Sequence, residues 1–343
     1  SKYAFVNDMV RVIPKVERPV DIREAMDFFR SEDPRTKVPL VDGTTIDYLP
    51  AQRLALPVNK DNAIAAGIVK EEDRDLMVDT VYLNLRRGVL DKSELMVIDL
   101  LSNFDWKRPI HFTQVYILQN LGLTDYLQFD GYSYRLVPIL TPYDRRVGEI
   151  GRIDPDVIYP LLMETFRYGN VSDPRVYVDN FIQYNLMASG AREAFARAAK
   201  AFLRRGGAGD RDKAVALLDA GLEKMPPAQI RYTFSNTFPF LEAYYAAGEM
   251  EKGDALLLSY AENLMQYLDY YLAFEGVQGD MVSGLIDDKL DELGQIYLLA
   301  GYAGRRDAVA RLNDYYRTLG ATDEDLLHVD APGEATDSLL PIP

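Results

Sequence analysis

The sequence predicts an α+β protein that is predominantly helical. We expect a mixed α/β region over residues 1–150, a tetratricopeptide-repeat-like (TPR-like) array of antiparallel helical hairpins over 151–320, and an acidic tail over 321–343. Two observations predict this class. Short runs of β-branched and aromatic residues, interrupted by proline, fill the first region. Beyond Gly190, three segments repeat the order helix, glycine turn, helix.

Composition excludes several classes of protein. With 343 residues, of which 48% are apolar, the chain is long enough for two domains with real cores. A net charge of −15 argues against a nucleic-acid partner, which needs a clustered basic surface. The absence of cysteine removes disulfides, thiol catalysis and cysteine-ligated zinc, and it fits a periplasmic location. Because the chain begins at Ser1 rather than methionine, we expect a domain or a processed product of a longer protein.

Local signals predict the first elements of the N-terminal region. The run "YAFVNDMVRVIP" is typical of a strand stopped by Pro14. Asp21 and Glu24 form a D-x-x-E capping box for a short helix that ends before Pro34. The run "TTIDYLPAQRLALPV" predicts two short strands separated at Pro50.

The next elements follow in the same way. Asn59 can cap a small helix, and the alternation in "DLMVDTVYLNL" predicts a strand. Ser93 can cap a helix that begins at Glu94. A helix at 117–127 and a strand in "GYSYRLVPIL" complete the region.

Helices are expected to dominate from Asp154 onward. Asp154-Pro155 and Asp173-Pro174 each combine a helix cap with proline at the first helical position. The three repeated segments are "FLRRGGAGDRDKAVALLDAGLEKMP", "YYAAGEMEKGDALLLSYAENLM" and "LLAGYAGRRDAVARLNDYYRTLG". In each, a helix ends near a glycine and the next helix opens on an alanine: Gly206 and Ala214, Gly248 and Ala255, Gly301 and Ala308.

The glycine spacing predicts longer helices than a standard repeat of this kind. The intervals are 42 residues (206 to 248) and 53 residues (248 to 301), against about 34 in a TPR. A basic run between Arg192 and Lys213, which also includes Arg197 and Lys200, is expected on outward, solvated helix faces.

Motifs for catalysis and metal binding are absent from the sequence. It contains no G-x-S-x-G, no Walker A loop, no H-E-x-x-H and no EF-hand loop. The two histidines, His111 and His328, are far apart in the chain, so a histidine-based metal site or triad is not expected. We expect no cofactor, while calcium binding by carboxylates alone stays open.

The stretch "NFDWKRPIHF" holds the single tryptophan and has two interpretations. As a ligand site, Trp106 would stack on a sugar with Asp105, Arg108 and His111 as polar partners. As a structural element, Trp106 would be buried and a strand would begin at Pro109, which supplies no N–H.

Tyrosines crowd the repeated segments and also allow two interpretations. A tyrosine with an apolar ring and a polar tip suits a half-buried seam between helices. Alternatively, some of these rings line a concave surface that meets a peptide or glycan; the candidates are Tyr244, Tyr245, Tyr270 and Tyr271.

The stretch around Trp106 also carries a family resemblance. "SELMVIDLLSNFDWKRPIHF" resembles the L-x-x-LDLL…N-x-W-x-RPI-x-F segment of a Bacteroidetes family of large membrane proteins of unknown function. Further matches are "DYLPAQRLALPVNKDNAIAAGIV", "GLTDYLQFDGYSYRLVPI", "METFRYGN" and the segment from Arg192 to Pro226. His111 stands where the family has tyrosine, and no catalytic residue can be carried over.

The resemblance implies where the protein is located and what it is attached to. Members of the family carry an N-terminal multispanning region similar to protein O-mannosyltransferases and other lipid-sugar-dependent glycosyltransferases, followed by a soluble region that this chain matches. It implies a periplasmic domain tethered to the inner membrane. We therefore expect a non-catalytic interaction domain that positions a protein or glycan partner beside its own membrane region. The alternative is a glycan-active enzyme domain that uses carboxylates near Trp106.

Overall fold

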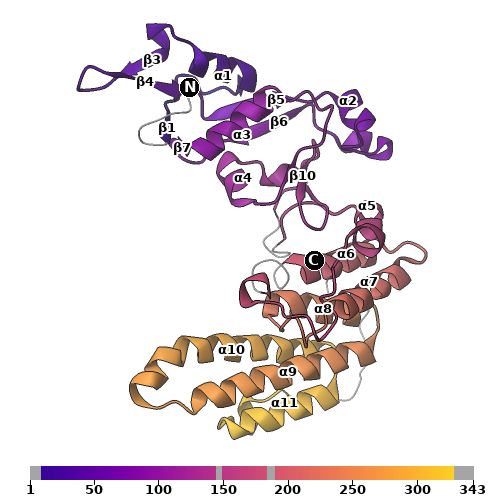
Figure 1. Ribbon diagram of the computed structural model, residues 1–343. Helices are drawn as coiled ribbons and strands as arrows, with labels where there is room; N and C mark the ends of the chain where they lie inside the picture. Colours follow the sequence, from indigo (N-terminus) through magenta and orange to yellow (C-terminus); the bar gives the residue numbers. More distant parts are fainter. Residues whose placement is uncertain (1–8, 144–148, 184–189, 328–343) are drawn as a thin grey trace. The chain divides into compact units, whose positions relative to one another are not determined.

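The chain folds into two compact units. The structure, a computed structural model, describes residues 9–143, 149–183 and 190–327 (Figure 1). Contacts divide the chain into residues 1–154, here the N-terminal unit, and residues 155–343, here the helical unit. Small sheets with short helices form the first and a series of helices forms the second, so the predicted fold class is confirmed. Most of the predicted acidic tail lies outside the described residues.

Three small sheets build the N-terminal unit. The first has the order β3 (Lys37–Pro39), β4 (Thr45–Leu49), β1 (Met9–Val12), β7 (Val89–Asp91). The second has the order β2 (Val20–Asp21), β5 (Arg53–Pro57), β6 (Thr80–Asn84). The third has the order β8 (His111–Phe112), β10 (Tyr134–Leu136), β9 (Leu127–Phe129). Pairing is mixed, since β1 runs parallel to β4 and antiparallel to β7.

Asp21 and Asn59 cap helices in this unit as predicted, but Asp21 accepts from Arg23 rather than from Glu24, so the predicted D-x-x-E capping box was wrong. The Asp21 carboxylate accepts a hydrogen bond from the N–H of Arg23 at the start of α1 (Ile22–Arg30). Asn59 accepts one from the N–H of Asn62 in α2 (Lys60–Ala65). Each interaction satisfies a backbone donor that the first helical turn leaves unpaired.

Two other predictions here were wrong in their boundaries. Helix α3 (Lys92–Ser102) is capped by Asp91 rather than Ser93, because Asp91 forms a reciprocal capping box with Glu94. The helix expected at 117–127 is only α4 (Tyr116–Leu121). Gly122 ends it in a left-handed conformation, and a Cβ there would lie 2.9 Å from the backbone nitrogen of Asn84.

The helical unit consists mainly of three hairpins (Figure 1). They are preceded by α5 (Pro155–Pro160), which continues into a π-helical turn (Leu161–Thr165). The hairpins are α6 (Arg192–Arg205) with α7 (Asp210–Lys224), α8 (Phe234–Ala246) with α9 (Met250–Leu272), and α10 (Gly276–Tyr302) with α11 (Arg306–Thr318). The turns carry glycines of positive φ at Gly206, Gly209, Gly248 and Gly304.

Helix α10 ends at Tyr302, next to Gly301 as predicted, and Gly304, with a φ of 66°, lies in the turn that follows. The expectation for residues 173–174 was wrong. Asp173-Pro174 begins no helix; the Asp173 carboxylate accepts the N–H of Arg175 and pairs with its guanidinium, which closes a local turn.

Small residues allow adjacent helices to approach closely. A Cβ on Gly221 of α7 would lie 2.9 Å from the Phe240 ring of α8. A Cβ on Gly253 of α9 would lie 2.5 Å from the Tyr245 ring of α8. A Cβ at either distance would force the neighbouring ring to shift, so glycine at both positions suits the close packing.

Candidate functional site

Trp106 belongs to the core of the N-terminal unit. Its side chain is fully buried, the indole N–H donates to the carbonyl of Pro57 at 2.8 Å, and the ring packs on Phe104. The backbone holds it at a φ of 64°, a left-handed conformation that is uncommon for a bulky residue. A ring without exposed surface has no face on which a sugar could stack.

The polar residues near Trp106 have separate partners. Asp105 pairs with Lys107 at 2.8 Å, and this hydrogen bond lowers the pKa of the carboxyl. Arg108 is exposed. His111 Nδ1 lies 3.0 Å from the hydroxyl oxygen of Ser133, and partial burial lowers the pKa of the imidazole. The structure therefore does not gather these side chains around one point.

Tyr244 and Tyr245 form part of the core between helices. Both are buried in α8; the Tyr244 hydroxyl donates to Asp219 of α7, and the Tyr245 hydroxyl donates to Asp254 of α9. Burial, and then the adjacent carboxylate, raise the pKa of each phenol above its ordinary value. Both hydroxyls therefore join α8 to neighbouring helices.

Tyr270 and Tyr271 sit near the end of α9. Tyr270 is 62% exposed and packs edge-on against Phe274. Tyr271 is half-buried and stacks on Tyr267 one turn earlier, with ring centroids 6.0 Å apart. Of the tyrosines predicted as ligand contacts, only Tyr271 lines the main groove of this unit.

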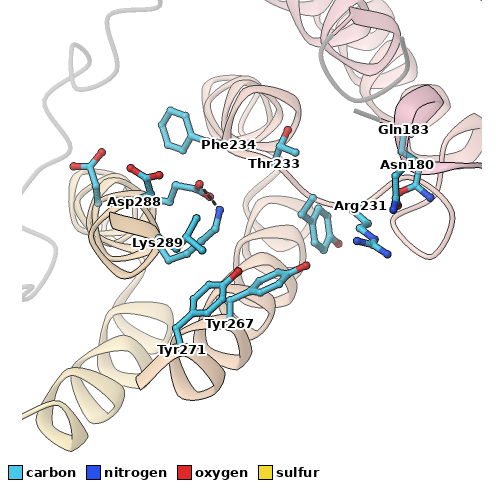
Figure 2. A pocket seen from close by; sticks show the side chains of 13 residues that line it. Asn180, Gln183, Arg231, Thr233, Phe234, Tyr267, Tyr271, Asp288 and Lys289 are labelled. Carbon is cyan, nitrogen blue, oxygen red and sulfur yellow. Dashed lines mark hydrogen bonds and ion pairs between the residues drawn. The ribbon is translucent and has the colours of Figure 1, made fainter. Parts of the chain in front are cut away.

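That groove is the candidate site. It has a volume of about 660 Å³ and is lined from four places in the helical unit: residues 180–183, the segment 231–234, α9 and α10. Figure 2 shows Tyr267 and Tyr271 across from Thr233 and Phe234, with Asn180 and Gln183 at one end. Aromatic faces and amide groups thus meet in one hollow, a combination typical of binding sites.

A capping box fixes the wall that carries Thr233 and Phe234. The Thr233 hydroxyl accepts the N–H of Asn236, and the buried Asn236 amide oxygen accepts the N–H of Thr233. The Asn236 amide also donates to the carbonyl of Arg231 at 3.0 Å. The segment 231–234 therefore has a defined shape without any ligand.

A buried arginine supports the same wall. Arg192 of α6 is fully buried, and its guanidinium donates to the carbonyls of Met225 and Ile230 and to the Asn236 amide oxygen. Burial lowers its pKa to about 10, so it remains a cation at neutral pH. The prediction of solvated faces for the basic run was wrong for Arg192, Arg197 and Lys200, all of which are buried.

The charges in the groove are only partly neutralised. Lys289 pairs with Glu292 at 2.5 Å, and Glu292 also accepts the buried hydroxyl of Tyr260. Asp288 and Asp291, on the same helix, form no ion pair with any described residue, and neither does Arg231 on the opposite wall. The groove thus offers two carboxylates and one guanidinium to an incoming molecule.

Most of these residues have no local signal in the sequence. Asn180, Arg231 and Asp288 come from segments far apart in the chain, and none belongs to a recognisable motif. A usable signal was the density of acidic residues among the apolar residues of the segment 276–302.

Across 9–143, 149–183 and 190–327, no group of three or more histidine or carboxylate side chains is arranged to hold a metal ion; His328 lies outside these ranges. Within the same ranges, no helix has both the length and the apolar character needed to cross a bilayer.

One comparison with known proteins is informative. Residues 2–157 match the family described as TMEM260-associated domain 2. No curated protein and no solved structure matches the chain. The N-terminal unit is therefore similar to a domain that is linked to a family of membrane proteins.

Proposed function

We propose that this chain is a non-catalytic binding region of a membrane-anchored, glycosyltransferase-like protein, and that its helical unit holds a polypeptide partner in the groove. The observation that carries the proposal is the groove itself, where aromatic rings from α9 face a rigid wall at 231–234. Asp288 and Asp291, which form no ion pair within the described part of the chain, give it polar groups that a polypeptide can satisfy.

The wider setting rests on similarity. The match of residues 2–157 to a membrane-protein-associated domain and the resemblance described above support an anchored protein. We propose further that this region faces the periplasm, that it positions its partner for the membrane region, and that the three hairpins are TPR-like, with stacked antiparallel helix pairs. A phosphatase reporter fused after Pro343 of the full-length protein should be active on the periplasmic side; activity of a cytoplasmic reporter at that position would contradict the assignment.

The alternative is a glycan-active site near Trp106, and the geometry supports it less. The indole is buried, and Asp105, the residue before Trp106, has a lowered pKa because it pairs with Lys107. A general acid in glycoside hydrolysis needs a raised pKa instead.

A display selection tests the binding proposal. A random peptide library is selected on the whole chain, and the affinities of the selected peptides are measured by fluorescence anisotropy. Tyr267→Ala should abolish binding by removing a ring of the groove, whereas Tyr302→Ala, an exposed tyrosine that does not line the groove, should leave it unchanged.

Calorimetry with mannose and glucose oligosaccharides forms the second arm of the test. Saturable sugar binding that depends on Tyr267, or the failure of any peptide to bind there, would overturn the proposal. Circular dichroism melts of the variants check that each one folds.

A further inference from the structure

The first half of α10 carries an exposed apolar stripe. Val277, Met281 and Leu285 are 76%, 80% and 44% exposed. Their spacing of four places them along one face of the helix. Leu285 also lines the groove, so the stripe and the groove form a continuous surface.

The same helix is strongly acidic, and its charges are largely unpaired. Between Gly276 and Tyr302 it has five acidic residues and one lysine. Four of these acids form no ion pair with any residue that the structure describes; they are Asp280, Asp287, Asp288 and Asp291. Some acids elsewhere in the helical unit do pair with cations: Asp210 with Arg205, and Asp254 with Arg305.

We propose that the groove and this stripe form one docking surface for a basic amphipathic helix of a partner protein. The inference rests on the proposed function and specifies its partner. The partner's apolar side chains would cover Val277, Met281 and Leu285, while its lysines and arginines would meet the unpaired carboxylates. Docking of a helix along an apolar stripe is a recurrent mode of peptide recognition.

Charge favours a cationic helix on this surface over a second copy of the chain or an anionic membrane. A second copy of the chain would bring one acidic α10 against another, and like charges across an interface are unfavourable. An anionic membrane surface would repel the same carboxylates. A cationic helix, in contrast, is attracted to a chain with a net charge of −15.

The test uses synthetic peptides and the whole chain. The probe is a 20-residue helix of leucine and lysine with leucines at three- and four-residue spacing. One comparison peptide has glutamate for lysine, and another has the same composition in scrambled order. Anisotropy should show binding of the first peptide alone, and its affinity should fall as salt is added.

Paired variants locate the binding surface. Asp288→Asn with Asp291→Asn should weaken binding about tenfold, as expected for the loss of two charged contacts. Asp212→Asn with Glu223→Gln changes the net charge equally on exposed positions of α7 and should leave binding unchanged. Met281→Ser should also weaken binding, whereas Met96→Ser, at a 58% exposed position of the N-terminal unit, should not.

Several outcomes would overturn the inference. An equal loss of binding in the α7 control would show that the peptide is attracted by the net charge of the chain and not by this surface. Binding of the chain to anionic vesicles would show that the stripe contacts a membrane instead. Dimers that form with increasing concentration in ultracentrifugation would show that it contacts a second copy. Selected peptides that need Tyr267 but ignore Asp288, Asp291 and Met281 would defeat this inference while leaving the proposed function standing. Loss of all peptide binding would defeat both.

Discussion

At the scale of single residues, Trp106 combines an unfavourable backbone with a favourable side-chain environment. A left-handed conformation costs about 1–2 kcal/mol for a residue with a Cβ. Complete burial of an indole that also donates to the carbonyl of Pro57 offsets this cost. The position therefore requires a large ring with an N–H, whatever its backbone prefers.

We expect Trp106→Ala to lower the free energy of unfolding by about 3–5 kcal/mol, because it empties a large, fully buried site. Trp106→Phe should cost less, since it keeps part of the packing although it loses the hydrogen bond to Pro57 and part of the ring volume. Urea denaturation of both variants measures the difference. An unchanged midpoint for Trp106→Ala would show that the ring does not stabilise the core.

Arg192 is the second residue whose role is fixed by its surroundings. Arg192→Met should destabilise the helical unit by about 3 kcal/mol, because it leaves the buried carbonyls of Met225 and Ile230 without donors. Arg192→Lys keeps the charge but supplies only one point of attachment, so we expect an intermediate loss. Because the same arginine supports the wall at 231–234, peptide binding should weaken along with stability. Stability like that of the parent would contradict this role.

At the scale of elements, the close approach of α8 and α9 depends on Gly253. Gly253→Val should destabilise by about 1–3 kcal/mol, because its side chain would overlap the Tyr245 ring. The matched control is Gly284→Ala in α10, where a Cβ meets nothing within 4 Å. This control should stabilise by about 0.5–1 kcal/mol through helix propensity. Thermal melts of the two variants should therefore shift in opposite directions.

The helix caps and the groove show how much of the structure could be predicted from the sequence alone. Caps at Asp21 and Asn59 were predictable because donor and acceptor lie within four residues of each other. Asp91 and Ser93 are both suitable caps, and only the position of Glu94 relative to the cap distinguishes them. The groove was not predictable, because Asn180 and Glu292 meet there through packing that no local pattern encodes.

At the scale of the whole molecule, ionisation of tyrosine should limit stability at high pH. Burial raises the pKa of five tyrosines in the helical unit: Tyr244, Tyr245, Tyr260, Tyr315 and Tyr316. The value for Tyr316 is about 12, against 10 for an ordinary tyrosine. The folded state therefore holds these protons more tightly than the unfolded state does, and stability is lost as pH rises above 10.

We expect the urea midpoint to fall steadily between pH 10 and pH 12. Arg192 acts in the opposite direction, because its lowered pKa favours the folded state in that window, but it is one group against five. Phenolate absorbance near 295 nm should rise together with unfolding. Tyr260→Phe should reduce the slope, and an unchanged slope in this variant would contradict the assignment.

The polar links between hairpins have a consequence for how the helical unit can evolve. The Tyr244 hydroxyl of α8 donates to Asp219 of α7, which joins the first hairpin to the second. Arg305, in the turn between α10 and α11, donates to Asp254 of α9, which joins the third hairpin to the second, while Asp254 also accepts the Tyr245 hydroxyl within the second hairpin. Each contact between neighbouring hairpins thus uses its own pair of polar side chains. Deletion or duplication of a hairpin would leave a carboxylate or a phenol without its hydrogen-bond partner. This array therefore cannot gain or lose hairpins as a solenoid with interchangeable repeats and uniform apolar contacts can.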